Sequence, residues 1–262
     1  MFELQFFLIG IIQGITEFLP ISSSGHLVLF AKLTNWDDQG LFTDIAVHFG
    51  TLFAVILYLR KDIYYLVSTI FKFKIFDDQI IFKIVLSTLP AIFLGYFIYD
   101  YVSLYFRSIQ LIAISSIVFA IILYFADKIG TQTKSWKNIT YKEALLVGLF
   151  QVLAFIPGAS RAGVTITGAR ILGYDRLNSA KFSMLLSIPI ILASMALSLI
   201  SLINEKQIIP VNFHHSLFAA IVAFITALLS IIFLMRFIKQ ANFNIFIIYR
   251  IILGIILLII YV

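Results

Sequence analysis

Long apolar runs separated by short polar connections dominate this chain. Six runs of about 20 residues are long enough to cross the hydrocarbon core of a bilayer as α-helices. They lie near residues 41–60, 80–99, 109–126, 179–203, 213–236 and 244–262. The pattern predicts an all-α polytopic membrane protein with six transmembrane helices.

Two further apolar stretches, residues 2–33 and 142–172, are each broken by a polar cluster. In the first, a proline precedes SSSGH at residues 22–26; in the second, a proline and a glycine precede SRAG at residues 160–163. Irregular backbone at membrane depth survives only where protein or a water-filled cavity satisfies it. We therefore predict two re-entrant helix-loop-helix elements, each of which enters and leaves on one side of the membrane.

Basic residues cluster in alternate connections, as they do in short cytoplasmic loops. The intervening connections, residues 34–40, 100–108 and 204–212, hold only Arg107 and Lys206. The rich connections contain Arg60, Lys61, Lys72, Lys74 and Lys83, then Lys128, Lys134, Lys137 and Lys142, and finally Arg236 and Lys239. Six spans and two re-entrant elements place every rich connection on the cytoplasmic side. The first element then opens to the outside and the second to the cytoplasm.

The two broken stretches also resemble each other. FLPISS in the first lines up with FIPGAS in the second, and Gln13 matches Gln151 once a single gap is allowed. This alignment pairs Ser23 with Ser160. Because the stretches enter from opposite faces, we predict an inverted-topology repeat. The boundaries are residues 1–262 for a single membrane domain, about 1–126 for the first repeat and about 140–262 for the second.

Composition agrees with a membrane protein and narrows its chemistry. Apolar residues make up 61% of the chain and its mean hydropathy is +1.05, well above soluble domains. The net charge of +6 is spread between apolar runs and forms no stripe that could follow a nucleic-acid backbone, so we expect no nucleic-acid partner. The absence of cysteine excludes disulfides and thiolate metal sites.

Ionisable and hydroxyl groups in the broken stretches are costly to place beside lipid, which indicates a functional site. Arg161 offers a planar donor fork that suits phosphate, and Ser160, Thr165 and the backbone near Gly163 could line an anion cradle. In the first stretch, Glu17 could hold a divalent cation or act as a base, His26 could transfer a proton, and one serine of 22–24 could attack phosphorus. The site residues we predict are Glu17, Ser23, His26, Ser160, Arg161, Gly163 and Thr165.

Each of these residues also has a purely structural interpretation. Glu17 and Arg161 could form an ion pair that only holds the repeats together. Ser22 and Ser24 could simply permit close helix contact, and His26 could bond a neighbouring carbonyl. The vicinal pair His214 and His215 has no special ligand geometry, so we expect no metal there.

The two motifs closely resemble the signatures of bacitracin-resistance-type undecaprenyl-diphosphate phosphatases. They are GITEFLPISSSGH at residues 14–26 and PGASRAGVTI at residues 157–166. The resemblance extends over nearly the whole chain, since its length, its order of spans and several short sequences are similar to that family. These short sequences are Phe182-Ser183, Ile188-Pro189, Tyr249-Arg250 and Gly254.

The resemblance implies a hydrolase of the bacterial inner membrane that converts undecaprenyl diphosphate to the monophosphate carrier used in peptidoglycan synthesis. It further implies a site facing the periplasm and a divalent cation, Mg²⁺ or Ca²⁺. Glu17 would serve the metal or proton transfer, Ser23 would attack phosphorus and His26 would activate it, while the second motif would bind the diphosphate. Gln13 would be a weaker metal ligand, because an amide supplies no second negative charge. Ala162 replaces a serine that is frequent in the family.

Two other functions remain open at this stage. A secondary transporter or lipid flippase would use an inverted repeat with opposed re-entrant loops, but a carrier for neutral solutes needs no nucleophile beside a phosphate-type arginine. An intramembrane serine protease would leave Arg161 without a task. The sequence is compatible with a monomer and with a homodimer.

Overall fold

The computed structural model describes residues 2–34, 36, 39–71, 79–105, 108–130, 133–204 and 213–261. Lys72, Lys74, Arg107, Lys206 and Val262, which entered the sequence predictions, lie outside these residues. The described chain is helical, apart from short turns and an isolated bridge between Lys134 and Tyr174. It is therefore all-α, as the hydrophobic pattern predicted.

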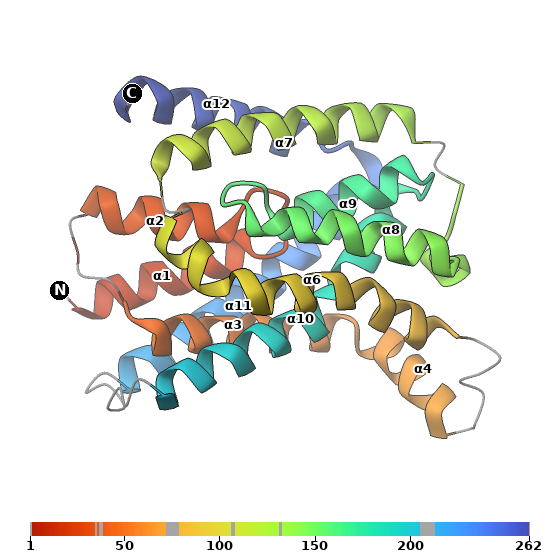
Figure 1. The fold of residues 1–262 in the computed structure, drawn as a ribbon, viewed down its shortest axis with the longest axis horizontal. Helices are drawn as coiled ribbons and strands as arrows, with labels where there is room; N and C mark the ends of the chain where they lie inside the picture. The colour runs from red at the N-terminus through yellow and green to blue at the C-terminus, as the bar shows by residue number, and fades with distance from the viewer. Residues whose placement is uncertain are drawn as a thin grey trace.

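Six of the described helices are long and apolar enough to cross a membrane. They are α3 (Leu41–Tyr58), α6 (Ile80–Tyr105), α7 (Ile109–Ile129), α10 (Arg176–Asn204), α11 (Phe213–Gln240) and α12 (Asn244–Tyr261). Each coincides with one of the six predicted apolar runs, so that prediction is confirmed. Figure 1 shows these helices running along the long direction of the molecule, with α7 beside α12 at its upper edge.

Both of the other apolar stretches form two short helices joined by irregular backbone. The first comprises α1 (Phe2–Thr16) and α2 (Ser23–Thr34), and the second comprises α8 (Tyr141–Val152), the 3₁₀ turn η2 (Leu153–Phe155) and α9 (Arg161–Ile171). The longest of these helices has 15 residues, which at 1.5 Å per residue is shorter than the roughly 30 Å hydrocarbon core. We call the irregular segments, residues 17–22 and 153–160, the first and second break.

Two short helices were not predicted. The helix α4 (Arg60–Phe71) follows α3 after Leu59 alone, and the turn η1 (Trp136–Asn138) precedes α8. Figure 1 shows α4 projecting from the body of the molecule, and its Tyr64 and Phe71 side chains are exposed. The charged residues at the start of α4 made this segment look like part of a loop.

Glycines on the short helices let the backbones of neighbouring helices approach closely. A Cβ on Gly14 of α1 would lie 1.9 Å from Thr226 Oγ1 and 2.7 Å from the carbonyl of Ala223 on α11. A Cβ on Gly148 of α8 would lie 2.5 Å from the carbonyl of Ser87 on α6. Each broken element is thus seated against one long helix, α1 on α11 and α8 on α6.

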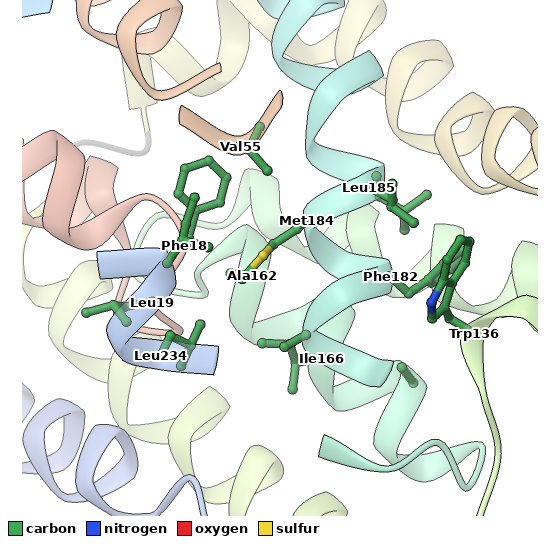
Figure 2. Packing of buried hydrophobic residues seen from close by; sticks show 14 of the residues in the cluster. Phe18, Leu19, Val55, Trp136, Ala162, Ile166, Phe182, Met184, Leu185 and Leu234 are labelled. Carbon is green, nitrogen blue, oxygen red and sulfur yellow. The ribbon is translucent and has the colours of Figure 1, made fainter. Parts of the chain in front are cut away.

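The main hydrophobic core surrounds the two breaks. Phe18, in the first break, is buried and points toward Val55 of α3 and Met184 of α10 (Figure 2). Ala162, at the start of α9, belongs to the same cluster. Polar groups carried by the breaks are therefore fixed by packed side chains close by, which limits their freedom to relax.

Candidate active site

Each break ends at a serine in the left-handed backbone region. Ser22 has φ 74° and Ser160 has φ 71°, a conformation that costs a residue with a side chain about 1 kcal/mol or more. The strain accompanies an N-cap, because Ser22 Oγ accepts a hydrogen bond from the Gly25 N–H at 3.4 Å and Ser160 Oγ accepts one from the Gly163 N–H at 3.2 Å. Ser22 and Ser160 are therefore structural counterparts, whereas the sequence alignment had paired Ser23 with Ser160.

This correction removes the gap between the glutamines and the caps. The same number of positions separates Gln13 from Ser22 and Gln151 from Ser160. Two replacements follow from the new register. Phe155 stands at the position of Glu17, and Arg161 stands at the position of Ser23.

Arg250 of α12 joins the two breaks. Its guanidinium donates to the carbonyl of Pro20 at 3.3 Å and to the carbonyls of Gly158 and Ala159 at 2.8 and 3.1 Å. The side chain is fully buried. Gly158 has φ 91°, and a Cβ there would lie 2.2 Å from Ser115 Oγ, so the approach of the second break requires glycine. These contacts hold residues from opposite ends of the chain at one place.

Glu17 and Arg161 form an ion pair across the breaks. Arg161 Nη2 lies 2.8 Å from Glu17 Oε1, and the two side chains are 14% and 8% exposed. Arg161 Nη1 also donates to the carbonyl of Ser183 at 3.2 Å, and its guanidinium lies 5.7 Å from the centre of the Phe18 ring. A buried ion pair with additional hydrogen bonds offsets much of its desolvation cost.

The second oxygen of the Glu17 carboxylate serves two donors from the first element. Ser23 Oγ donates to Glu17 Oε2 at 2.9 Å, and Gln13 Nε2 donates to the same oxygen at 3.0 Å. The Glu17 carboxylate thus contacts both the Ser23 hydroxyl, which is a candidate nucleophile, and the positively charged Arg161. A hydroxyl that donates to a carboxylate is already aligned to transfer its proton there.

These groups surround a cavity of about 240 Å³. Its lining residues are Glu17, Ser22, Ser23, Ser24, His48, Ala154, Ser160, Arg161, Ile190, Ile191 and Ser194. The cavity brings together four of the predicted site residues: Glu17, Ser23, Ser160 and Arg161. The start of α9 also lies at this cavity, and a helix N-terminus attracts anions through its free N–H groups.

His26 does not line the cavity. Its Nδ1 lies 2.7 Å from the carbonyl of Ser22, so Nδ1–H is the donor, and its Nε2 lies 2.6 Å from the Tyr249 hydroxyl. The two rings are stacked, with centroids 5.7 Å apart. Both nitrogens of His26 are therefore engaged with the protein, and its imidazole contacts α12.

Gly163 and Thr165 lie behind the cavity lining. Thr165 is fully buried, and its hydroxyl donates to the Arg161 carbonyl at 2.8 Å and contacts Ser183 Oγ at 2.6 Å. A Cβ on Gly163 would lie 3.0 Å from Arg250 Nη1. The two residues brace the start of α9 and thereby position Arg161.

Two lining residues from long helices, His48 of α3 and Ser194 of α10, were not among the predicted site residues. His48 Nδ1 lies 2.7 Å from the carbonyl of Asp44 on the preceding turn. The available signal was a histidine within an otherwise apolar membrane span, since ionisable residues in such spans usually face a cavity or a partner.

A second polar cluster anchors the start of α8. Glu143 accepts hydrogen bonds from Lys134 Nζ at 2.6 Å, from the Tyr174 hydroxyl at 2.8 Å and from the Thr140 N–H at 2.9 Å. Burial raises the pKa of Glu143, but the hydrogen bonds from Lys134, Thr140 and Tyr174 outweigh it and lower the pKa to about 2. Thr140 and Glu143 also complete a capping box. The carboxylate stays ionised at neutral pH.

Only a sparse set of metal ligands is available at the cavity. The described residues contain no group of three or more His, Asp or Glu side chains placed to hold a metal ion. Glu17 lines the cavity and supplies one carboxylate. Gln13 is bonded to Glu17 but is not itself a lining residue, and its buried Oε1 has no hydrogen-bond partner among the described residues. Mg²⁺ is commonly held by one or two carboxylates together with substrate phosphates and water. Glu17 and Gln13 fit a cation site that the substrate completes, and do not form an all-protein cage.

Comparison with known proteins gives consistent matches along the chain. The family described as "Bacitracin resistance protein BacA" matches residues 6–256. A protein of Idiomarina loihiensis named undecaprenyl-diphosphatase is 39% identical over 259 residues, which is 97% of each chain. A protein of Campylobacter curvus with the same name is 40% identical, also over 259 residues and 97% of each chain. The chain therefore belongs to the bacitracin resistance protein BacA family.

Proposed function

We propose that this protein hydrolyses undecaprenyl diphosphate to undecaprenyl phosphate and inorganic phosphate. The reaction recycles the lipid carrier for peptidoglycan synthesis and confers bacitracin resistance. The observation that carries the proposal is a single cavity where Ser23 and Glu17 face Arg161. The names of two relatives, each about 40% identical, support the same reaction.

Arg161 and the start of α9 bind the diphosphate. The guanidinium carries a fixed positive charge and a planar set of donors that matches phosphate oxygens. Ser160 lines the same cavity. A cavity of about 240 Å³ accommodates the phosphate groups. The long isoprenoid chain stays among the membrane lipids, where its apolar surface is not exposed to water.

Ser23 attacks the terminal phosphorus. Its proton passes to Glu17, which already accepts its hydrogen bond. The bond from that phosphorus to the bridging oxygen breaks, and its electron pair leaves with undecaprenyl phosphate. Water then hydrolyses the phosphoserine, and Ser23 regains its proton from Glu17. Arg161 balances the negative charge that gathers on the phosphoryl oxygens.

A divalent cation, Mg²⁺ or Ca²⁺, would be held by Glu17 with Gln13. When bound, it would neutralise charge on the phosphate oxygens as a Lewis acid. His26, which the family resemblance would assign to activation of Ser23, instead fixes the Ser22 carbonyl through its Nδ1–H. In this proposal Glu17 performs the activation and His26 positions the first break.

The two broken elements are re-entrant and belong to an inverted-topology repeat. Support comes from the short helices, from the matching caps at Ser22 and Ser160, and from their placement, with α1 and α2 in one half of the molecule's length and α8 and α9 in the other (Figure 1). The distribution of Lys and Arg supports an opening of the first break to the periplasmic side of the bacterial inner membrane.

The test is phosphate release by the purified protein in detergent, with undecaprenyl diphosphate and the shorter farnesyl diphosphate as substrates. We expect hydrolysis of both, loss of activity on chelation, and a loss of at least about 10²-fold in Ser23→Ala. Ser68→Ala, on the exposed face of α4, is the control. A folded sample that releases no phosphate from either lipid would overturn the proposal.

A further inference from the structure

The cavity contains one imidazole, and it belongs to His48. The other histidine near the breaks, His26, does not line the cavity, and both of its ring nitrogens are already hydrogen-bonded, to the Ser22 carbonyl and the Tyr249 hydroxyl. Glu17 cannot serve every proton transfer, because its carboxylate already holds Arg161, Ser23 and Gln13. Hydrolysis of a phosphoserine requires a second proton acceptor for the attacking water.

The backbone of α3 fixes the tautomer of His48. The Asp44 carbonyl can only accept, so the Nδ1 of His48, 2.7 Å away, carries a hydrogen and donates it. In neutral imidazole the other nitrogen, Nε2, is then unprotonated and acts as an acceptor. No described residue donates to this Nε2. The ring therefore presents a free basic nitrogen while its orientation is held by its own helix.

The charged groups around His48 are engaged with other partners or lie at helix ends, so His48 is the candidate for the second proton acceptor. Glu17 and Arg161 face it across the cavity and neutralise each other. The lining residues from α10 do not titrate; they are Ile190, Ile191 and Ser194. On α3 itself, the Asp44 carboxylate accepts a hydrogen bond from Gln39. The acidic, basic and histidine residues of α1, α4 and α11 stand near the ends of those helices: Glu3, Arg60, Lys61, Asp62, His214, His215, Arg236 and Lys239.

We propose that His48 is a catalytic residue of the second half of the reaction. Its Nε2 takes one proton from the water that attacks phosphoserine 23. The bond from phosphorus to Ser23 Oγ breaks, Oγ recovers the proton stored on Glu17, and inorganic phosphate leaves. His48 then returns its proton to solvent. This inference rests on the proposed function, and it divides the two proton transfers between Glu17 and His48.

The test separates the two products in time. In His48→Asn, the amide can still donate to the Asp44 carbonyl, so the local structure is kept while the basic nitrogen is lost. We expect a burst of one undecaprenyl phosphate per protein, phosphate retained on Ser23, and release of inorganic phosphate slowed by about 10²–10⁴-fold. Added imidazole should accelerate that release in His48→Gly.

The control is His26→Gln, which keeps a polar group facing Tyr249 and should accumulate no phosphoserine. The proposal is overturned if His48→Asn shows no burst of undecaprenyl phosphate and no phosphate retained on Ser23, or if His26→Gln is the variant that accumulates phosphoserine. Thermal unfolding in detergent verifies that each variant is folded. A wild-type protein that hydrolyses no lipid diphosphate would instead overturn the proposed function itself, so the two failures are distinguishable.

Discussion

The first and second breaks end in the same kind of cap and carry opposite chemistry. Each ends at a serine with positive φ that caps the following helix, and each follows a helix that carries a buried glutamine. At equivalent positions, however, the first break has Glu17 and the second has Phe155. The next residue after the cap is Ser23 in one and Arg161 in the other. The acid and the hydroxyl of the site therefore come from the first broken element, and the positive charge comes from the second.

The buried glutamines Gln13 and Gln151 show that the replacement of Glu17 by Phe155 leaves a buried amide without a partner. Gln13 donates to Glu17, whereas neither the oxygen nor the nitrogen of the Gln151 amide has a partner among the described residues. Gln151 is only 1% exposed. The carboxylate that would receive its N–H is replaced by the apolar ring of Phe155. The second break thus keeps a buried amide whose desolvation is uncompensated.

Removing the positive charge of Arg161, directly after the second break, should have the largest effect on activity. Arg161→Gln leaves Glu17 buried without its partner and removes the main phosphate donor, so we expect kcat/KM to fall about 10²–10³-fold. Arg161→Lys should recover only part of this loss, because an ammonium lacks the planar fork. Phosphate release from the lipid diphosphate measures both. Activity of Arg161→Gln within threefold of wild type would contradict the assigned roles of the two breaks.

Separating the breaks should have the next largest effect. Arg250→Met removes three hydrogen bonds to the carbonyls of Pro20, Gly158 and Ala159. Buried carbonyls without donors cost about 1 kcal/mol or more each, so we expect a loss of roughly 3 kcal/mol in the free energy of unfolding. Unfolding in mild detergent measures it. Arg236→Met, near the end of α11, is the control and should change stability little; equal effects of both substitutions would argue against the joining role of Arg250.

The two glutamines allow a matched comparison with smaller effects. Gln13→Leu should lower kcat/KM about tenfold, because Glu17 loses one of its donors. Gln151→Leu should leave activity unchanged and raise stability by about 1 kcal/mol, because an unpartnered amide is replaced by an apolar side chain. Parallel activity and unfolding measurements decide. Identical behaviour of the two variants would mean that the breaks are not chemically distinct.

The smallest effect concerns the anchor of the second element. The pKa of Glu143 is lowered to about 2 in the folded protein from an ordinary value of 4.5. Its contribution to stability is therefore complete above about pH 4.5 and is lost as the pH falls toward 2. The unfolding temperature should drop by a few degrees over this interval in wild type, and less in Glu143→Gln. Parallel pH dependences of the two proteins would exclude this contribution.

The sequence predicted the features that depend on composition and on local energetic cost. The six spans follow from apolar runs, and the breaks follow from polar clusters within such runs. The pairing of Glu17 with Arg161 follows because neither charge is tolerable alone at that depth. From the sequence, a structural ion pair and a functional site were alternative roles for Glu17 and Arg161. In the structure the two residues form an ion pair and also line the cavity.

The sequence did not predict the features that depend on the direction of a side chain. His26 turns toward Tyr249, a residue 223 positions away, because α2 begins at Ser23 after a left-handed Ser22. His48 reaches the cavity only because α3 packs beside the breaks. The alignment of the two broken stretches was also wrong by one residue, since sequence letters align Ser23 with Ser160 while φ angles and caps identify Ser22.

The position of Arg250 also determines when its contacts with the two breaks can form during synthesis of the chain. It lies in α12, which is synthesised after both breaks, yet it donates to the carbonyl of Pro20 in the first break. Until α12 has been made, the two breaks lack the hydrogen bonds of Arg250 and are linked by the ion pair of Glu17 with Arg161. A nascent chain, or one truncated before α12, thus carries the reactive groups without the bonds of Arg250 to both breaks, and we expect activity to arise only once α12 is present.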